Sequence, residues 1–295
     1  MSNQTLIDLR NSDFPTYIRL HTAGLESDFA YVGSLTSKLS FEEEERKYVY
    51  GDLLARSFGM VGYFMTSYIQ RGMKLDEAGI DELKLDVAGH DLWGMARHLF
   101  RNPDTSDFHR YTIYEELTAS EKRFVNRMAW FSLVNFVNPN LFGIRNFTLK
   151  NGHKMSFKLG YSVSPFGGYF REDVYYFIPS KNLKIGGYLS EYMNHTRMFL
   201  AGGISLHNYK ITDKILFNGN LDIWSQPRHL DFTTSQAMTG AGISLNGAYK
   251  FFKWEEGKSL YANFGLSAKS KGFLPENPSL DSHFKVQMGI IYALE

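Results

Sequence analysis

The chain of 295 residues contains no cysteine. This absence excludes disulfides, thiolate metal sites and thiol nucleophiles. The chain also lacks an excess of charge, because 32 Lys and Arg residues balance 31 Asp and Glu residues to give a formal net charge of +1. A chain without a strong charge excess does not indicate a nucleic acid partner, so we expect none.

Long apolar runs are missing as well, and the mean hydropathy is −0.29. The longest apolar stretch, SFGMVGYFMTSYI at 57–69, is too short and too interrupted to cross a bilayer as a helix. The first 25 residues contain no basic segment followed by an apolar core, so they predict no signal peptide. The sequence has no phosphate-binding loop, no nucleophile elbow and no metal-ligand spacing, so we expect neither a cofactor nor a metal.

The two halves of the chain differ in charge and in pattern. Residues 1–147 hold 16 Lys and Arg against 20 Asp and Glu, a net charge of −4, whereas residues 148–295 hold 16 against 11, a net charge of +5. Apolar residues recur at helical spacing in the first half and at every second position in the second half. The sequence therefore predicts an α+β chain, with a mostly helical region at 1–147 and an antiparallel β-region at 148–295.

The first half predicts helices after an irregular start. Thr118 and Glu121 form a capping-box signal before one apolar run. Shorter alternating pieces at 16–20 and 28–33 favour strands. The expected helices are 42–71, 80–101 and 117–137.

The second half predicts strands of similar length separated by turn residues such as Asn151-Gly152 and Thr212-Asp213. Such closely spaced strands are typical of antiparallel hairpins. The eight expected strands are 154–163, 168–178, 182–193, 196–209, 213–224, 238–251, 259–270 and 283–294.

Each expected strand has one bulky apolar face and one small or polar face, since alternate side chains point to opposite sides. In KMSFKLGYSV at 154–163, the apolar parity consists of Met155, Phe157, Leu159, Tyr161 and Val163. An eight-stranded barrel has an interior only just wide enough for side chains, so roughly forty large apolar groups do not fit inside it. The small and polar face suits that interior better, and segments of this length cross a bilayer when tilted.

We therefore expect an antiparallel, eight-stranded transmembrane β-barrel with its apolar face toward lipid. The predicted lipid-facing residues are Met155, Phe157, Leu159, Ile215, Phe217, Leu221, Ile243, Leu245, Val286, Met288 and Ile290. The predicted lumen-facing residues are Ser156, Lys158, Gly160, Lys214, Asn218, Asn220, Asp222, Ser244, Asn246, Lys285 and Gln287. A soluble sandwich that binds a ligand is the alternative, because two stacked sheets can each bury one apolar face.

The C-terminal run QMGIIYAL carries a polar residue, a glycine and two apolar or aromatic residues at fixed spacing: Gln287, Gly289, Tyr292 and Leu294. With this run, the second half resembles the bacterial outer-membrane β-barrel class, in which such a pattern is an assembly signal. Leu294 departs from the pattern, since the class has an aromatic residue there. The resemblance implies a Gram-negative outer-membrane location, contact with outer-membrane lipid, and a role in transport, secretion or envelope organisation.

One segment of the helical region invites a catalytic interpretation. Asp86 and His90 are helix neighbours with Arg97 nearby, and a carboxylate beside an imidazole can orient a general base. The zinc-protease pattern fails because Gly94 stands in place of the second histidine, and His98 lies about 12 Å along the helix. The interpretations are a solvated polar face, a catalytic or metal role in an outer-membrane enzyme that modifies lipid or glycan, and a contact with a partner.

The helical region also needs a place beside the barrel. We expect it on the periplasmic side, in the membrane interface or against the barrel mouth, where it offers a surface to an envelope protein partner. Among the histidines of the second half, only His207 lies on the lumen parity, near a strand end. An enzyme built on a barrel would need such a histidine with a serine or an acid near one rim.

Overall fold

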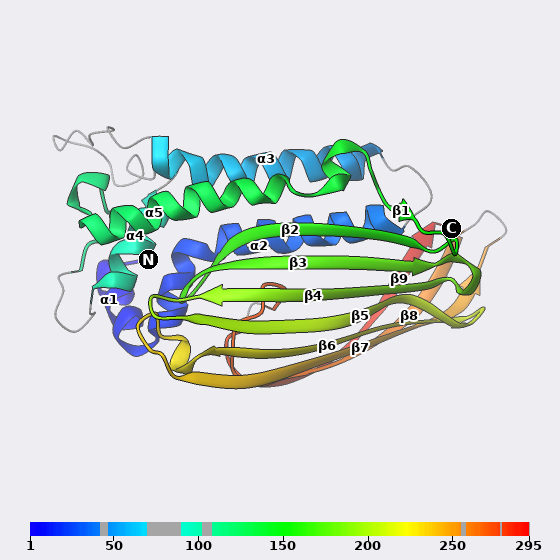
Figure 1. The fold of residues 1–295 in the computed structure, drawn as a ribbon. Helices are drawn as coiled ribbons and strands as arrows, with labels where there is room; N and C mark the ends of the chain where they lie inside the picture. Colours follow the sequence, from blue (N-terminus) through cyan, green and yellow to red (C-terminus); the bar gives the residue numbers. More distant parts are fainter. Residues whose placement is uncertain (42–46, 70–89, 102–107, 255–257, 278, 295) are drawn as a thin grey trace.

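The structure, a computed structural model, describes residues 1–41, 47–69, 90–101, 108–254, 258–277 and 279–294. The described α-helices all precede the long strands (Figure 1). The helices are α1 (Asn3–Ser12), α2 (Phe14–Phe41), α3 (Lys47–Ile69), α4 (His90–Phe100) and α5 (Ala119–Ser132), and single turns η3 (Leu133–Phe136) and η4 (Pro139–Phe142) follow α5.

The long helix α2 replaces the two strands expected near the N-terminus, so that prediction was wrong. Buried residues such as Ile18, Leu25, Phe29 and Val32 recur three, four or seven positions apart and form one continuous stripe. The short alternating pieces were fragments of this longer helical pattern.

The remaining helix predictions agree with α3, α4 and α5, although residues 80–89 lie outside the described part of the chain. The capping box is confirmed. The Thr118 hydroxyl accepts a hydrogen bond from the Glu121 amide at 3.3 Å, and the Glu121 carboxylate accepts one from the Thr118 amide at 2.7 Å.

The second half forms one antiparallel sheet in which each strand pairs with the next along the chain. Eight strands were expected and the described residues form nine, because the two-residue strand β1 precedes the eight long ones. The strands are β1 (Phe147–Thr148), β2 (Lys154–Ser164), β3 (Gly167–Ile178), β4 (Leu183–Met193), β5 (Met198–Thr212), β6 (Ile215–Pro227), β7 (Ala237–Lys253), β8 (Lys258–Lys269) and β9 (His283–Leu294).

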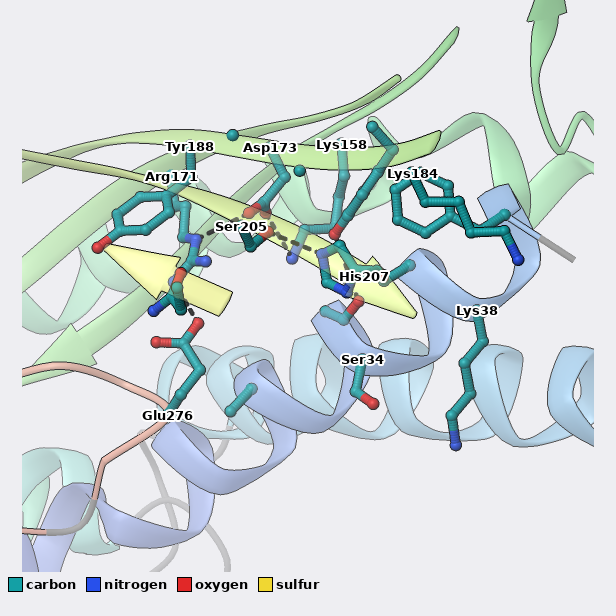
Figure 2. A pocket seen from close by; sticks show the side chains of 18 of the residues that line it. Ser34, Lys38, Lys158, Arg171, Asp173, Lys184, Tyr188, Ser205, His207 and Glu276 are labelled. Atoms are coloured by element: carbon teal, nitrogen blue, oxygen red, sulfur yellow. Dashed lines mark hydrogen bonds and ion pairs between the residues drawn. The ribbon is translucent and has the colours of Figure 1, made fainter. Parts of the chain in front are cut away.

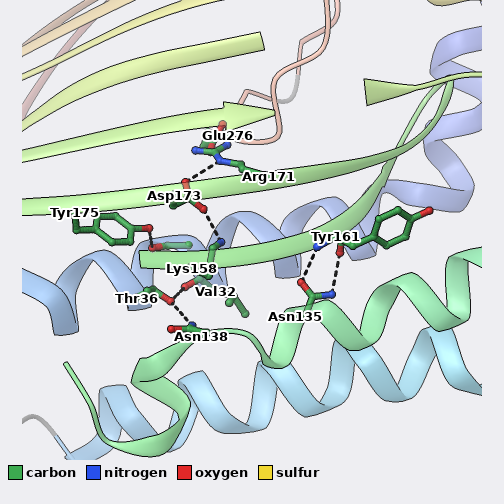
Figure 3. A network of polar contacts seen from close by, with 11 residues as sticks. Val32, Thr36, Asn135, Asn138, Lys158, Tyr161, Arg171, Asp173, Tyr175 and Glu276 are labelled. Carbon is green, nitrogen blue, oxygen red and sulfur yellow. Dashed lines mark hydrogen bonds and ion pairs between the residues drawn. The ribbon is translucent and has the colours of Figure 1, made fainter. Parts of the chain in front are cut away.

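The described strands form an open sheet, with β1 at one edge and β9 at the other, rather than a closed barrel or two stacked sheets. The outer edge of β2 is occupied by the segment that follows α5. The Leu159 amide donates to the Val137 carbonyl at 3.0 Å, and the Asn135 side chain bonds both the amide and the carbonyl of Tyr161 at 3.0 and 2.9 Å (Figure 3). These contacts satisfy the edge groups that barrel closure would use.

The sheet curves around α2, which runs along β2 and β3, while α3 and α5 form a further helical layer (Figure 1). We call the sheet face toward α2 the concave face and the opposite one the convex face. One hydrophobic core joins both halves of the chain, since Phe29, Phe64 and Trp93 from the helices share it with Tyr161 and Tyr169 from the strands.

The connection between β8 and β9, residues 270–282, folds back onto the concave face. Phe273 is fully buried there, and its backbone amide and carbonyl both bond the Gln226 side chain, at 2.8 and 2.6 Å. The Lys269 ammonium donates to the carbonyl groups of Gly272 and Ser279, at 2.6 and 2.9 Å. The concave face is therefore filled from two sides, by α2 and by this connection.

Candidate functional site

The two faces of the sheet differ in what they expose: apolar side chains are exposed on the convex face, and charged side chains are buried on the concave face. On the convex face, Ile204 and Ile223 are each 62% exposed and Met288 is 80% exposed. On the concave face, Lys158 and Asp173 are only 3% and 5% exposed. Charged residues are rarely buried in this way unless they are paired, so the concave face forms a polar interior in which charged groups have partners.

The predicted lipid-facing side chains lie mostly at the surface. Those that are exposed are Phe157, Leu221, Ile243, Leu245, Val286, Met288 and Ile290. Those that are partly buried are Met155, Leu159, Ile215 and Phe217. Two members of the same parity, Tyr161 and Val163, are buried instead of facing outward. The Tyr161 ring packs against Phe64 of α3 and Phe131 of α5, with ring centroids 5.8 and 5.5 Å apart, because the helical layer covers this end of β2.

The predicted lumen-facing residues differ in burial according to what covers them. Ser156, Lys158, Gly160 and Asp222 are buried, and Asn218, Asn220 and Asn246 are partly buried. Lys214, Ser244, Lys285 and Gln287 are exposed, since they lie at a strand end or on the strands near the β9 edge.

The main candidate site is a cavity of about 420 Å³ between α2 and the concave face of β2–β6 (Figure 2). A chain of ion pairs forms one wall, and it runs from the buried Lys158 and Asp173 to Glu276, whose side chain is half exposed. Lys158 lies 3.0 Å from Asp173, Arg171 donates to the same carboxylate at 2.9 Å, and Arg171 also pairs with Glu276 of the β8–β9 connection (Figure 3). Such charges are stable in an interior only because each has an opposite partner.

A second group of polar side chains continues this wall toward β6. The Arg171 guanidinium lies over the Tyr188 ring, 3.9 Å from its centroid. The Tyr188 hydroxyl donates to Asp222 at 2.8 Å, and the Asn220 amide donates to the same carboxylate at 2.5 Å. The network therefore joins side chains of β2, β3, β4 and β6 in one arrangement.

A neighbouring cavity of about 570 Å³ lies between β6–β9 and the β8–β9 connection. Asn220, Asp222 and Glu276 line both cavities. Lys269 and Lys285 add positive charge to the second cavity. The concave face thus presents a nearly continuous polar surface that carries both signs of charge.

Two further side chains of the first cavity form a hydrogen-bonded pair. The Ser205 hydroxyl and the His207 Nε2 atom are 2.7 Å apart (Figure 2). Arg171, Asp173, Glu276 and Ser205 were not among the predicted site residues. Strand parity predicts that the side chains of Arg171, Asp173 and Ser205 point to the same face of the sheet. The local sequence pattern predicts neither the position of α2 nor the folding back of the β8–β9 connection that brings Glu276 to this face.

The earlier catalytic candidates are not assembled into a centre by the described residues. Asp86 lies outside the described part of the chain, and His90 is the first residue of α4. Arg97 is nearly buried and donates to Glu116 at 2.9 Å. Among the described residues, no three His, Asp or Glu side chains are close enough to share a metal ion.

A histidine of the same helix is buried in an unusual environment. His98 Nε2 lies 2.8 Å from the Tyr17 hydroxyl, and its ring stacks on His21 with centroids 5.6 Å apart. Burial lowers the pKa of His98 to about 2, and the nearby His21, Arg10 and Arg97 add to this effect. His98 is therefore a neutral structural residue rather than a proton carrier at neutral pH.

The proposed assembly-signal residues all belong to β9. Gln287 and Gly289 lie on the concave side, Tyr292 is 55% exposed on the convex side, and Leu294 is the last residue of the strand. None of the described helices is long and apolar enough to span a membrane. Comparison of the chain with known protein families, with curated proteins and with solved structures finds no match.

Proposed function

We propose that this chain is an outer-membrane protein in which β2–β9 cross the bilayer, with the part of the convex face that the helices leave uncovered against lipid. The proposal rests on which side chains each face of the sheet exposes. Large apolar side chains such as Ile204 and Ile223 are exposed on the convex face, while Lys158 and Asp173 are buried on the concave one. A contiguous exposed apolar surface of this kind requires an apolar partner, and lipid fits a curved sheet whose apolar side chains cover several adjacent strands.

Strand length supports the same placement. The long strands β2–β9 contain between 11 and 17 residues each, and a tilted strand of about 10 residues crosses the hydrocarbon layer. Aromatic side chains at strand ends, including Trp254, Phe252 and Tyr292, pack together near the β7–β8 turn. Their position suits a membrane–water interface, where aromatic rings are enriched.

Within the outer membrane, we assign the chain a transport role for a small polar solute. The concave cavities are lined by charges of both signs, which suits a polar or zwitterionic molecule. Because α2 and the β8–β9 connection occupy the concave face, the space is too small for a folded polypeptide. Accordingly, planar-bilayer recordings should show no stable conductance in the nanosiemens range, and such a conductance would contradict a filled interior.

The decisive experiment places a spin label at Leu245 or at Ser244 after reconstitution into liposomes. These neighbours lie on opposite faces of β7. A lipid-soluble relaxation agent should broaden the signal at 245 and leave the signal at 244 unchanged. If both labels respond only to a water-soluble agent, the sheet does not contact lipid and the membrane assignment fails.

A further inference from the structure

The pair formed by Ser205 and His207 lies on a wall of the first cavity. The two residues are two positions apart on β5, so both side chains point to the concave face. Their side chains are half-buried, and the hydroxyl lies 2.7 Å from Nε2 of the imidazole. A hydroxyl within hydrogen-bond reach of an imidazole is the minimal arrangement of an activated oxygen nucleophile.

The backbone of β5 is irregular directly after this pair. The pairing of β5 with β6 shifts register between Leu206 and Tyr209. Asn208 has a left-handed φ of 46°, and its amide donates to the Asn218 side chain at 2.8 Å. Bulges of this type re-aim side chains and are frequent beside functional sites, and a left-handed residue other than glycine persists only where its surroundings hold it.

The neighbouring strand makes room for the pair. Gly186 lies opposite Ser205 in the β4–β5 ladder. A Cβ atom at Gly186 would lie 2.4 Å from the Ser205 hydroxyl oxygen and 3.0 Å from His207 Nε2. Any larger residue at 186 would therefore displace the two polar atoms, which explains a glycine in the interior of this strand.

The surroundings of the pair are divided into an apolar and a charged side. The Phe41 ring packs on the His207 imidazole with centroids 5.1 Å apart, and it also contacts Tyr175. Lys184 lies opposite His207 in the ladder and points to the same face. One end of a bound molecule would thus meet aromatic rings and the other a positive charge.

We propose that Ser205 and His207 form a catalytic pair that hydrolyses carboxylic esters whose alcohol part carries an anionic group. The Ser205 oxygen attacks the ester carbonyl while His207 Nε2 takes the hydroxyl proton. The tetrahedral adduct then breaks its bond to the alcohol oxygen, which leaves with the proton from His207. Water next attacks the acyl-serine carbonyl and gives one proton to His207, which passes it to the serine oxygen as the bond between that oxygen and the acyl carbon breaks; the carboxylic acid and the free serine are released.

The ring pair of Phe41 and Tyr175 would hold the acyl part of such an ester, while Lys184 would attract its anionic alcohol part. This activity differs from solute transport and uses none of the ion-paired residues of the cavity wall. It also differs from the centre expected around His90, since it lies on the sheet.

A fluorophosphonate probe tests the nucleophile directly in detergent-folded protein. Mass spectrometry of the labelled protein should find the adduct on Ser205. Ser205→Ala should abolish labelling, His207→Ala should slow it by about 10²-fold or more, and Ser267→Ala, another serine on the concave face, should leave it unchanged. Failure to label Ser205, or equal labelling of the His207 variant, would overturn the proposal whether or not the convex face contacts lipid.

Ester kinetics test the substrate class with two small acetyl esters, neutral 4-nitrophenyl acetate and anionic 4-acetoxybenzoate. Lys184→Met should lower kcat/KM for the anionic ester by about tenfold and leave the value for the neutral one within twofold. Identical changes for both esters would overturn the charge assignment. The folding of the Ser205→Ala variant is checked by its migration on a gel with and without heating, which should match that of the unmodified protein. Hydrolysis that persists in this folded variant would overturn the assignment of the nucleophile.

Discussion

Lys158 of β2 and Asp173 of β3 are direct cross-strand partners, and their charged groups are 3.0 Å apart beneath α2. The Lys158 ammonium also lies 4.4 Å from the centre of the Phe29 ring of α2. The pair therefore connects the sheet to the helix that fills its concave face. Both side chains are almost fully buried, so neither charge can turn to water if its partner is lost.

We predict that Lys158→Met lowers the free energy of unfolding by about 3 kcal/mol, since it leaves the buried Asp173 carboxylate with less compensation. Denaturant unfolding of the refolded protein, followed by tryptophan fluorescence, measures the change. Lys285→Met is the matched control, because Lys285 of β9 also points to the concave face but is exposed. This substitution should change the free energy of unfolding by less than about 0.5 kcal/mol. Equal effects of the two substitutions would contradict a paired, buried role for Lys158.

A close approach of α2 to β2 gives the next prediction. A Cβ atom at Gly160 would lie 2.6 Å from the Phe29 ring, whereas a Cβ atom at Gly289 of β9 would meet nothing within 4 Å. Gly160→Ala should therefore destabilise the fold by about 1–3 kcal/mol through overpacking. Gly289→Ala should be neutral or slightly stabilising, because alanine has the lower conformational entropy in the unfolded chain. Equal thermal stability of the two variants would mean that α2 does not lie against β2.

The eight long strands could be predicted from the sequence, with every end placed within three residues of its position in the structure. Their signals are local, since each hairpin has alternating side chains and ends at turn residues such as Asn151-Gly152. The small side chains of the concave face led to the prediction that this face lines the narrow interior of a barrel. What occupies it could not be predicted, because a helix inserted against a sheet leaves no mark in the strands except small residues such as Gly160.

The candidate site was predicted less well for a related reason. Arg171 and Glu276 meet only because the connection between two strands folds back, and they are 105 positions apart in sequence. Helical spacing drew attention to Asp86, His90 and Arg97, but Arg97 pairs with Glu116, 19 positions further along the chain, and helical spacing cannot reveal that contact. Strand parity places Arg171 and Asp173 on one face of β3, but aromatic residues such as Tyr175 and Phe177 share that face and hide the polar signal.

The capped edge of β2 provides a third prediction. Asn135 replaces a neighbouring strand by bonding both backbone groups of Tyr161, and its side chain is buried. Asn135→Ala should cost about 1–3 kcal/mol, because it leaves a buried amide and a buried carbonyl without that partner. Hydrogen exchange should show faster exchange of the Tyr161 amide in this variant. Unchanged protection of Tyr161 would indicate that the edge is held by other contacts.

Acid should weaken the helical region through His98. Its pKa in the folded protein is about 2, below the ordinary value of 6.5, so the unfolded chain binds the extra proton first. The stabilisation from neutral His98 is complete above pH 6.5 and is lost as the pH falls toward 2, by about 1.4 kcal/mol for each pH unit. His98→Gln should lower stability at pH 7 but flatten the fall in unfolding free energy between about pH 6 and 4. His229→Gln, at an exposed position, should keep the original slope, and parallel curves for all three proteins would contradict a buried neutral imidazole at position 98.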